Sequence, residues 1–104
     1  MSDTRIERFQ AMKARFPQSE MPRWSLASAL AEAGQVEPAI AELKELVALK
    51  PDYCVAWLEL GRLSAGRGDV ATARPALEEA IRLALAQGHS APRIDAEALL
   101  EDLD

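Results

Sequence analysis

The sequence is poor in the side chains that catalysis and metal binding use most often. Its 104 residues include one histidine, His89, and one cysteine, Cys54. A single cysteine cannot form a disulfide within the chain, which is typical of proteins in a reducing compartment. Because acid, base and nucleophile side chains do not gather at any useful spacing, we expect neither an enzyme nor a bound cofactor or metal.

The sequence also lacks a long apolar run and an excess of positive charge. Charged side chains are spread through residues 1–16, which excludes a signal peptide or a membrane span there. We therefore expect a cytoplasmic protein that does not bind membranes. The chain has 12 basic and 17 acidic residues and a formal net charge of -5. This balance disfavours nucleic acids as partners, because their phosphates are neutralised by lysine and arginine.

Alanine and leucine are the most abundant residues in the sequence. Hydrophobic residues make up 49% of the chain, whereas aromatic residues make up 5%. This composition favours closely packed helices over β-sheet, in which β-branched and aromatic residues are common. The length is typical of one domain. We therefore predict a single all-α domain over residues 1–104.

A repeat with a period of 34 residues runs through the middle of the chain. Periods of about 20 to 50 residues are typical of stacked helical units. Ordinary composition would give about two or three identities by chance in a window of this size, fewer than the sequence contains. The identical pairs are Leu26/Leu60, Ala31/Ala65, Gly34/Gly68, Val36/Val70, Ala39/Ala73, Leu43/Leu77, Glu45/Glu79 and Leu49/Leu83.

The two repeats, residues 20–51 and 53–87, each have the pattern of a helix, a glycine turn and a second helix. We expect turns at Gly34 and Gly68, helix N-caps at Asp52 and Asp69, and a helix end at Gly88. Apolar residues three and four positions apart predict one buried face on each helix. The expected core residues are Leu26, Ala27, Leu30, Ala39, Ile40, Leu43, Leu46, Val47 and Leu49, followed by Trp57, Leu60, Gly61, Leu63, Ala73, Leu77, Ala80 and Ile81.

Two further helices are predicted at the ends of the sequence, over residues 4–16 and 90–103. The first has the register of the second helix of a preceding repeat, and the other is expected to cover the last repeat. Their expected apolar stripes are Ile6, Phe9, Met12 and Phe16, and Ile94, Ala98, Leu99 and Leu103. The two ends differ in charge, with five basic and three acidic residues in 1–23 but one basic and five acidic in 91–104. Head-to-tail or reciprocal contacts between copies are therefore open, a homodimer among them.

The second repeat resembles the tetratricopeptide repeat (TPR) family. The first carries less of the family's pattern, because Trp24 stands one position late and Leu46 replaces the usual alanine. The matching residues are Trp57, Leu60, Gly61, Gly68, Asp69, Ala73, Leu77 and Ala80 in the second repeat, and Leu26, Gly34, Ala39, Leu43 and Pro51 in the first. The resemblance implies a right-handed α–α superhelix of about six helices.

It also implies a function, since the first helices of successive repeats in this family line a concave groove that receives a peptide or helix. The chain would then be an adaptor or scaffold for a protein or peptide that the sequence does not identify. The groove residues carried over from the family are Met21, Trp24, Ser28, Ala31, Val55, Leu58, Arg62 and Ala65.

Other interpretations stay open at this point. Trp24 and Leu58 lie one period apart, and they either contact a partner directly or are covered by the last helix of the chain itself. The chain could also be a self-assembling, homo-oligomeric structural module, because short repeat arrays bury little surface. A non-catalytic regulatory subunit of an enzyme is the third alternative.

Overall fold

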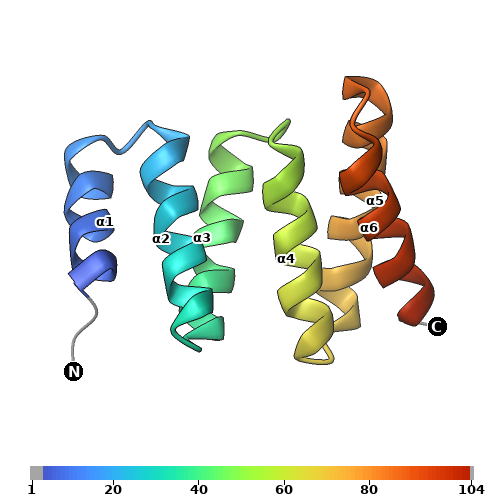
Figure 1. Ribbon diagram of the computed structural model, residues 1–104, viewed down its shortest axis with the longest axis horizontal. Coiled ribbons are helices and arrows are strands. Elements are labelled where there is room, and N and C mark those ends of the chain that lie inside the picture. Colours follow the sequence, from blue (N-terminus) through green and yellow to red (C-terminus); the bar gives the residue numbers. More distant parts are fainter. Residues whose placement is uncertain (1–3, 104) are drawn as a thin grey trace. The chain divides into compact units, whose positions relative to one another are not determined.

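The computed structural model describes residues 4–103, and these residues form six α-helices and no β-strand (Figure 1). The all-α class and the number of helices confirm the prediction from the sequence. Asp104, part of the acidic C-terminal end of the sequence, lies outside the described residues, as do residues 1–3. The helices are α1 (Thr4–Arg15), α2 (Glu20–Glu32), α3 (Val36–Leu49), α4 (Cys54–Gly66), α5 (Val70–Gln87) and α6 (Ser90–Asp102).

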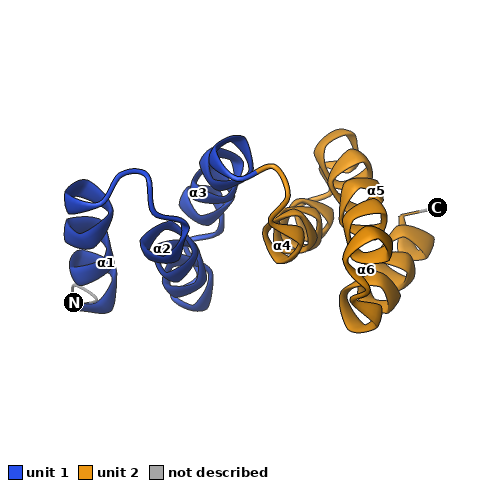
Figure 2. Ribbon diagram, turned by 90° about the horizontal axis from the view of Figure 1, so that it is seen from above, with its two compact units in different colours: residues 1–50 blue, residues 51–104 orange. Residues whose placement is uncertain are grey.

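The helices fall into two compact units, residues 1–50 and residues 51–104 (Figure 2). In the first unit, α2 packs against both α1 and α3. In the second unit, α4 and α5 form a hairpin, and α6 packs against both of them. Each unit therefore contains one helical hairpin and one additional helix, α1 before the first hairpin and α6 after the second.

The turns of the two hairpins have the same backbone geometry one period apart. Gly34 and Gly68 have φ angles of 79° and 75°, in the left-handed region that glycine adopts without steric cost. The N–H group that follows each glycine donates to the carbonyl oxygen of Leu30 or Ser64, at 2.9 Å in both turns. These bonds satisfy carbonyl groups that the end of a helix would otherwise leave unpaired. The repeat in the sequence is thus also a repeat in the backbone.

The core of each hairpin consists largely of the residues that the sequence predicts. In the second unit, Gly61 of α4 lies against Leu77 of α5, and both residues are buried. The indole N–H of Trp57 donates to the carbonyl oxygen of Pro51 at 2.8 Å, while its ring packs on the core. Four of the expected core residues are only half-buried, namely Leu49, Trp57, Leu63 and Ile81.

One of the two expected aspartate caps is wrong. Asp69 does cap α5, because its Oδ1 accepts a hydrogen bond of 3.1 Å from the N–H of Thr72. Asp52, however, lies one residue too early, since Tyr53 is the N-cap of α4 and makes no side-chain cap bond. The carbonyl oxygen of Asp52 instead accepts from Nε2 of Gln87 at 2.9 Å. At the other end of α5, Gly88 adopts the left-handed conformation expected of it.

The predicted apolar stripes of the terminal helices are also partly wrong. In α1, Ile6 is buried, but Met12 and the following Phe16 are 41% and 48% exposed. In α6, Ile94 is 57% exposed, and the fully buried residue is Ala96, which the sequence pattern does not single out. The helix is rotated relative to the prediction, so that Leu99, Leu100 and Leu103 flank Ala96 on the packed side. Each terminal helix therefore keeps apolar side chains on its surface.

Candidate functional site

The four groove residues predicted on α2 form one stripe along the helix. Met21 is the most exposed at 60%, and Trp24, Ser28 and Ala31 are half-buried. Their spacing of three and four residues places them on one side of a helix. The buried residues of α2 fall on the opposite side, and they are Pro22, Leu26, Ala27, Ala29 and Leu30. The stripe is therefore distinct from the core-facing side of α2.

The groove residues predicted on α4 are placed less uniformly. Leu58 is only 6% exposed, because it packs with Leu77 and Ala80 of α5 and with Ala96 of α6. Of the two alternatives for Leu58, burial beneath the last helix is the one that the structure of this unit favours. Val55 and Ala65 are half-buried, and Arg62 is exposed.

Arg62 lies in a small cleft of about 430 Å³ between α4 and α6. The cleft is lined by Arg62, Asp95, Ala98 and Leu99. Within its own helix, Arg62 pairs through Nε with Oε1 of Glu59 at 3.1 Å, an exposed pair one turn apart. Because Asp95 also faces the cleft, the surface offers one cation and one anion next to apolar carbon. It resembles the polar rim of a protein interface more than a binding pocket for one ion.

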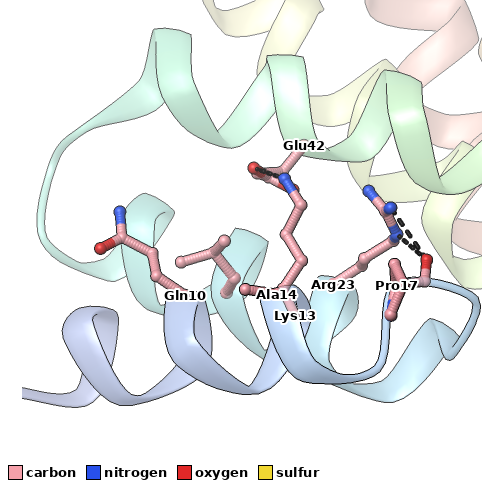
Figure 3. A pocket seen from close by; sticks show the side chains of 7 residues that line it. Gln10, Lys13, Ala14, Pro17, Arg23 and Glu42 are labelled. Carbon is pink, nitrogen blue, oxygen red and sulfur yellow. Dashed lines mark hydrogen bonds and ion pairs between the residues drawn. The ribbon is translucent and has the colours of Figure 1, made fainter.

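A second cleft, of about 380 Å³, lies among α1, α2 and α3 of the first unit (Figure 3). None of its residues belongs to the predicted groove. A basic side chain reaches into it from each of two helices, Lys13 from α1 and Arg23 from α2. The complete lining is Gln10, Lys13, Ala14, Pro17, Arg23, Leu26 and Glu42.

Ion pairs join the charged side chains in and beside this second cleft. The ammonium of Lys13 lies 2.7 Å from Oε1 of Glu42 and 3.0 Å from Oε2 of Glu45. Arg23 reaches Oε2 of Glu45 at 3.2 Å, and it donates to the carbonyl oxygen of Pro17 as well (Figure 3). Two cations thus face two carboxylates. The cluster ties α1 and α2 to α3, and its balanced charge makes it a structural feature rather than a site for an anion or a metal.

The charges of this cluster shift each other's proton affinity. Partial burial acts to lower the pKa of Lys13, but hydrogen bonds to Glu42 and Glu45 outweigh it and raise that pKa above its ordinary value. The hydrogen bond from Lys13 lowers the pKa of Glu45. Both groups are therefore held in their charged forms.

Cys54, the single cysteine of the sequence, is buried. Its Sγ donates to the carbonyl oxygen of Ala80 at 3.3 Å, and burial raises the pKa of its thiol. Reactive cysteines need the thiolate and access to solvent, and Cys54 has neither. His89 is exposed and precedes α6. Within residues 4–103, no three His, Cys, Asp or Glu side chains are arranged to hold a metal ion.

None of the helices in the described part of the chain is both long enough and apolar enough to span a bilayer. The features that the structure brings together are therefore surfaces on helices: the α2 stripe, the Arg62 cleft and the ion-paired cleft. The spacing of residues in the sequence predicts the α2 stripe and the position of Arg62. The ion-paired cleft brings together side chains that are far apart in the sequence. Its one indication in the sequence is the charge of Lys13, at a position where the later repeats have Val47 and Ile81.

Comparisons with known proteins agree with the repeated helical hairpins of the structure. No protein-family model matches the chain. A curated protein of Pseudomonas aeruginosa, named as a TPR repeat-containing protein, is 29% identical over 99 residues, which span 95% of this chain and 94% of that protein. A protein of Bordetella parapertussis, known from its solution structure, is 31% identical with a TM-score of 0.79, and the match covers 99% of this chain and 89% of the other.

A tetratricopeptide repeat domain protein of Salinibacter ruber is similar in fold. Its solution structure matches with a TM-score of 0.75 at 22% identity, over 84% of this chain and 88% of the other. The helical hairpins, the glycine turns one period apart and these relatives agree. The chain has the fold of tetratricopeptide repeat proteins, and it is similar in sequence over nearly its whole length to a protein named for that repeat.

Proposed function

We propose that this chain is a protein-interaction module that holds a peptide or a helix of another protein against the exposed stripe of α2. Similarity to TPR proteins supports the general role, because repeats of this family generally mediate contacts between proteins. The residues that carry the proposal in the first unit are Met21, Trp24, Ser28 and Ala31.

The observation that carries the proposal is the two-sided character of α2. One side is already packed inside its own unit, so the stripe is not needed for the core. Met21, at 60% exposure, offers an unbranched thioether side chain to solvent. Methionine adapts to irregular apolar partners, and tryptophan is enriched among the residues that dominate binding energy.

The second unit supplies a different kind of surface. Val55, Arg62 and Ala65 remain accessible on α4, whereas Leu58 supports them from beneath as a core residue. The side chain of Arg62 can bond a carboxylate or a carbonyl group of a partner, and Asp95 in the same cleft can bond a lysine or arginine. The formal net charge of -5 favours partners that are neutral or basic overall.

The test starts from peptides selected for binding to the full chain from a displayed random library. Their affinity is then measured for the wild type, for Met21→Glu and for Trp24→Ala. We expect at least about a tenfold loss of affinity in each variant, which corresponds to ~1.4 kcal/mol. Thermal melting followed by circular dichroism shows whether each variant is still folded.

A matched control is available on α5. Leu85 is 63% exposed and lies outside the proposed surface, so Leu85→Glu introduces the same charge at a similarly exposed apolar position. This variant is expected to bind as tightly as the wild type. If Met21→Glu and Leu85→Glu bind equally well, the α2 stripe is not the binding surface. Unfolding of Trp24→Ala would make Trp24 a core residue, and Met21→Glu would then carry the test.

A further inference from the structure

The terminal helix α1 exposes the face that is buried in the corresponding helix of the second repeat. Helix α5 buries six residues along one side, which are Ala73, Ala76, Leu77, Ala80, Leu83 and Ala84. Two periods earlier, the corresponding residues are Arg5, Arg8, Phe9, Met12, Arg15 and Phe16. None of these six is buried; Phe9 is half-buried and the other five are exposed.

The reason lies in the partner of each helix. The buried side of α5 packs on α4, the first helix of its hairpin, where Leu77 meets Gly61, and also on Ala96 of α6. Helix α1 has the register of such a second helix, but its packing in the described structure is with α2, the helix that follows it. Its hairpin-type face, with Met12 at 41% and Phe16 at 48% exposure, is left at the surface.

Helix α6 has the converse arrangement, because it follows a hairpin and occupies the place of a first helix. Counted from the first residue of each helix, Glu97 of α6 corresponds to Gly61 of α4, the residue that faces the second helix of its hairpin. The side of α6 that contains Glu97 is exposed, and Ile94 and Glu101 lie on it. Its opposite side, around Ala96, is packed on α4 and α5.

The two uncovered faces are complementary in charge. Helix α1 has four basic residues and one acidic residue, a net charge of +3, whereas α6 has one basic and four acidic, a net charge of -3. On the faces themselves, the charged residues include Arg8 and Arg15 on α1 and Glu97 and Glu101 on α6. Each face also presents exposed apolar side chains, Met12 and Phe16 on one and Ile94 on the other. Glu97 already pairs with Arg93 at 3.5 Å, but an exposed pair of this kind contributes little.

We infer that α6 of one copy of this chain packs against α1 of a second copy, so that each helix covers the face that the other leaves exposed. Two copies of α1, or two copies of α6, would bring like charges together, which opposes a dimer built on a contact between like helices. The contact joins two different surfaces, so a pair of copies joined once keeps one free α1 surface and one free α6 surface. Those two surfaces either bind each other, which closes a two-membered ring, or bind further copies in larger rings or chains.

The test measures the weight-average mass of the full chain by sedimentation velocity over a range of protein concentrations and salt. The mass should rise above that of the monomer as the concentration increases. It should fall when salt rises from about 0.1 M to about 1 M, because the Debye length shortens from ~10 Å to ~3 Å. A chain that stays monomeric at every concentration and salt overturns the inference.

Charge reversal identifies the surfaces. Arg8→Glu with Arg15→Glu, and separately Glu97→Arg with Glu101→Arg, should each weaken self-association at least about tenfold. All four changes in one chain restore opposite charges and should restore association. The control reverses exposed charges elsewhere, Lys44→Glu in α3 with Glu78→Arg in α5, and should change nothing. Failure of the fourfold variant to recover, while melting shows that it is folded, contradicts the pairing of α1 with α6.

This inference is independent of the proposed binding of a partner by α2. The reversed residues lie on α1 and α6, so peptide affinity should be the same in these variants as in the wild type. Self-association that does not respond to the charge reversals overturns this inference alone, whereas peptide binding that does not respond to Met21→Glu overturns the proposed function alone.

Discussion

Gly61 of α4 lies so close to Leu77 of α5 that a Cβ atom at position 61 would stand 2.5 Å from Cδ2 of the leucine. Leu77 is completely buried, so its side chain has little room to move away. The first hairpin has Ala27 at the corresponding position, also buried. The tight approach of the two helices in the second hairpin therefore depends on the absence of a side chain at Gly61.

Gly61→Ala is expected to destabilise the protein by about 1–3 kcal/mol, because it overpacks a filled core. Gly66 is the matched control, since it also lies in α4 but has no atom within 4 Å of an added Cβ and no positive φ. Gly66→Ala should stabilise the chain by about 0.4–1 kcal/mol. Urea unfolding of both variants compares the two effects. Equal effects in both variants would mean that Leu77 can move aside.

The helix caps give a second comparison. Asp69→Ala removes the hydrogen bond to the N–H of Thr72 and should cost about 1 kcal/mol of unfolding free energy. Asp52→Ala changes an aspartate that stands before a helix but does not cap it, so it should cost less than half as much. The free energies come from chemical denaturation. A larger loss at Asp52 than at Asp69 would contradict the capping that the structure describes.

These two aspartates illustrate what the sequence can and cannot predict. Turns follow from local chemistry, so Gly34 and Gly68 could be assigned from the repeat pattern, and Gly88 from its place directly after the last repeat. The register of a cap depends on one residue, and both aspartates precede an apolar helix, so the sequence does not separate them. The carbonyl oxygen of Asp52 accepts from Gln87, a residue that only the fold brings near it.

The orientation of the last helix could not be predicted from the sequence, for a related reason. Ile94 and Ala96 belong to different faces of α6, and the pattern favours the larger side chain for the core. The structure buries Ala96 instead, because a small residue lets α6 approach Leu58 and Leu77 closely. Whether Leu58 lies in a groove or beneath a helix depends on that choice, so the candidate site could be predicted only in part. The α2 stripe does not depend on α6.

The charged cluster in the first unit predicts a pH effect. Because Lys13 lowers the pKa of Glu45, the folded chain gains stability from this carboxylate above the pKa of its unfolded form. That gain is lost as the pH falls through the lowered pKa. The difference in unfolding free energy between wild type and Glu45→Gln should be below about 1 kcal/mol near neutral pH, since the pair is largely exposed. It should shrink towards zero in acid.

Lys13→Met provides the control for this effect. Without the ammonium, the pKa of Glu45 loses the main cause of its shift, so adding Glu45→Gln should then produce little dependence on pH. Denaturation of the four chains at neutral and acidic pH completes the cycle. A pH dependence of equal size with and without Lys13 would show that another group stabilises the carboxylate.

The thiol of Cys54 should be unreactive in the folded protein. Burial raises its pKa and hides the sulfur from solvent, so both thiolate formation and access are reduced. We expect an aromatic disulfide reagent to modify Cys54 slowly in buffer and rapidly in denaturant, with a rate in buffer that increases with pH. Rapid modification of the native chain at neutral pH would mean that α4 and α5 separate readily around this residue.

The proposed function depends most on where a bound partner touches the chain. Hydrogen exchange of the backbone amides, measured with and without a selected peptide, locates that contact in solution. We predict that slowed exchange concentrates on α2 around Met21 and Trp24, with Leu85 and its surroundings unaffected. A footprint that leaves α2 unchanged and falls elsewhere would contradict the proposal that this stripe is the binding surface.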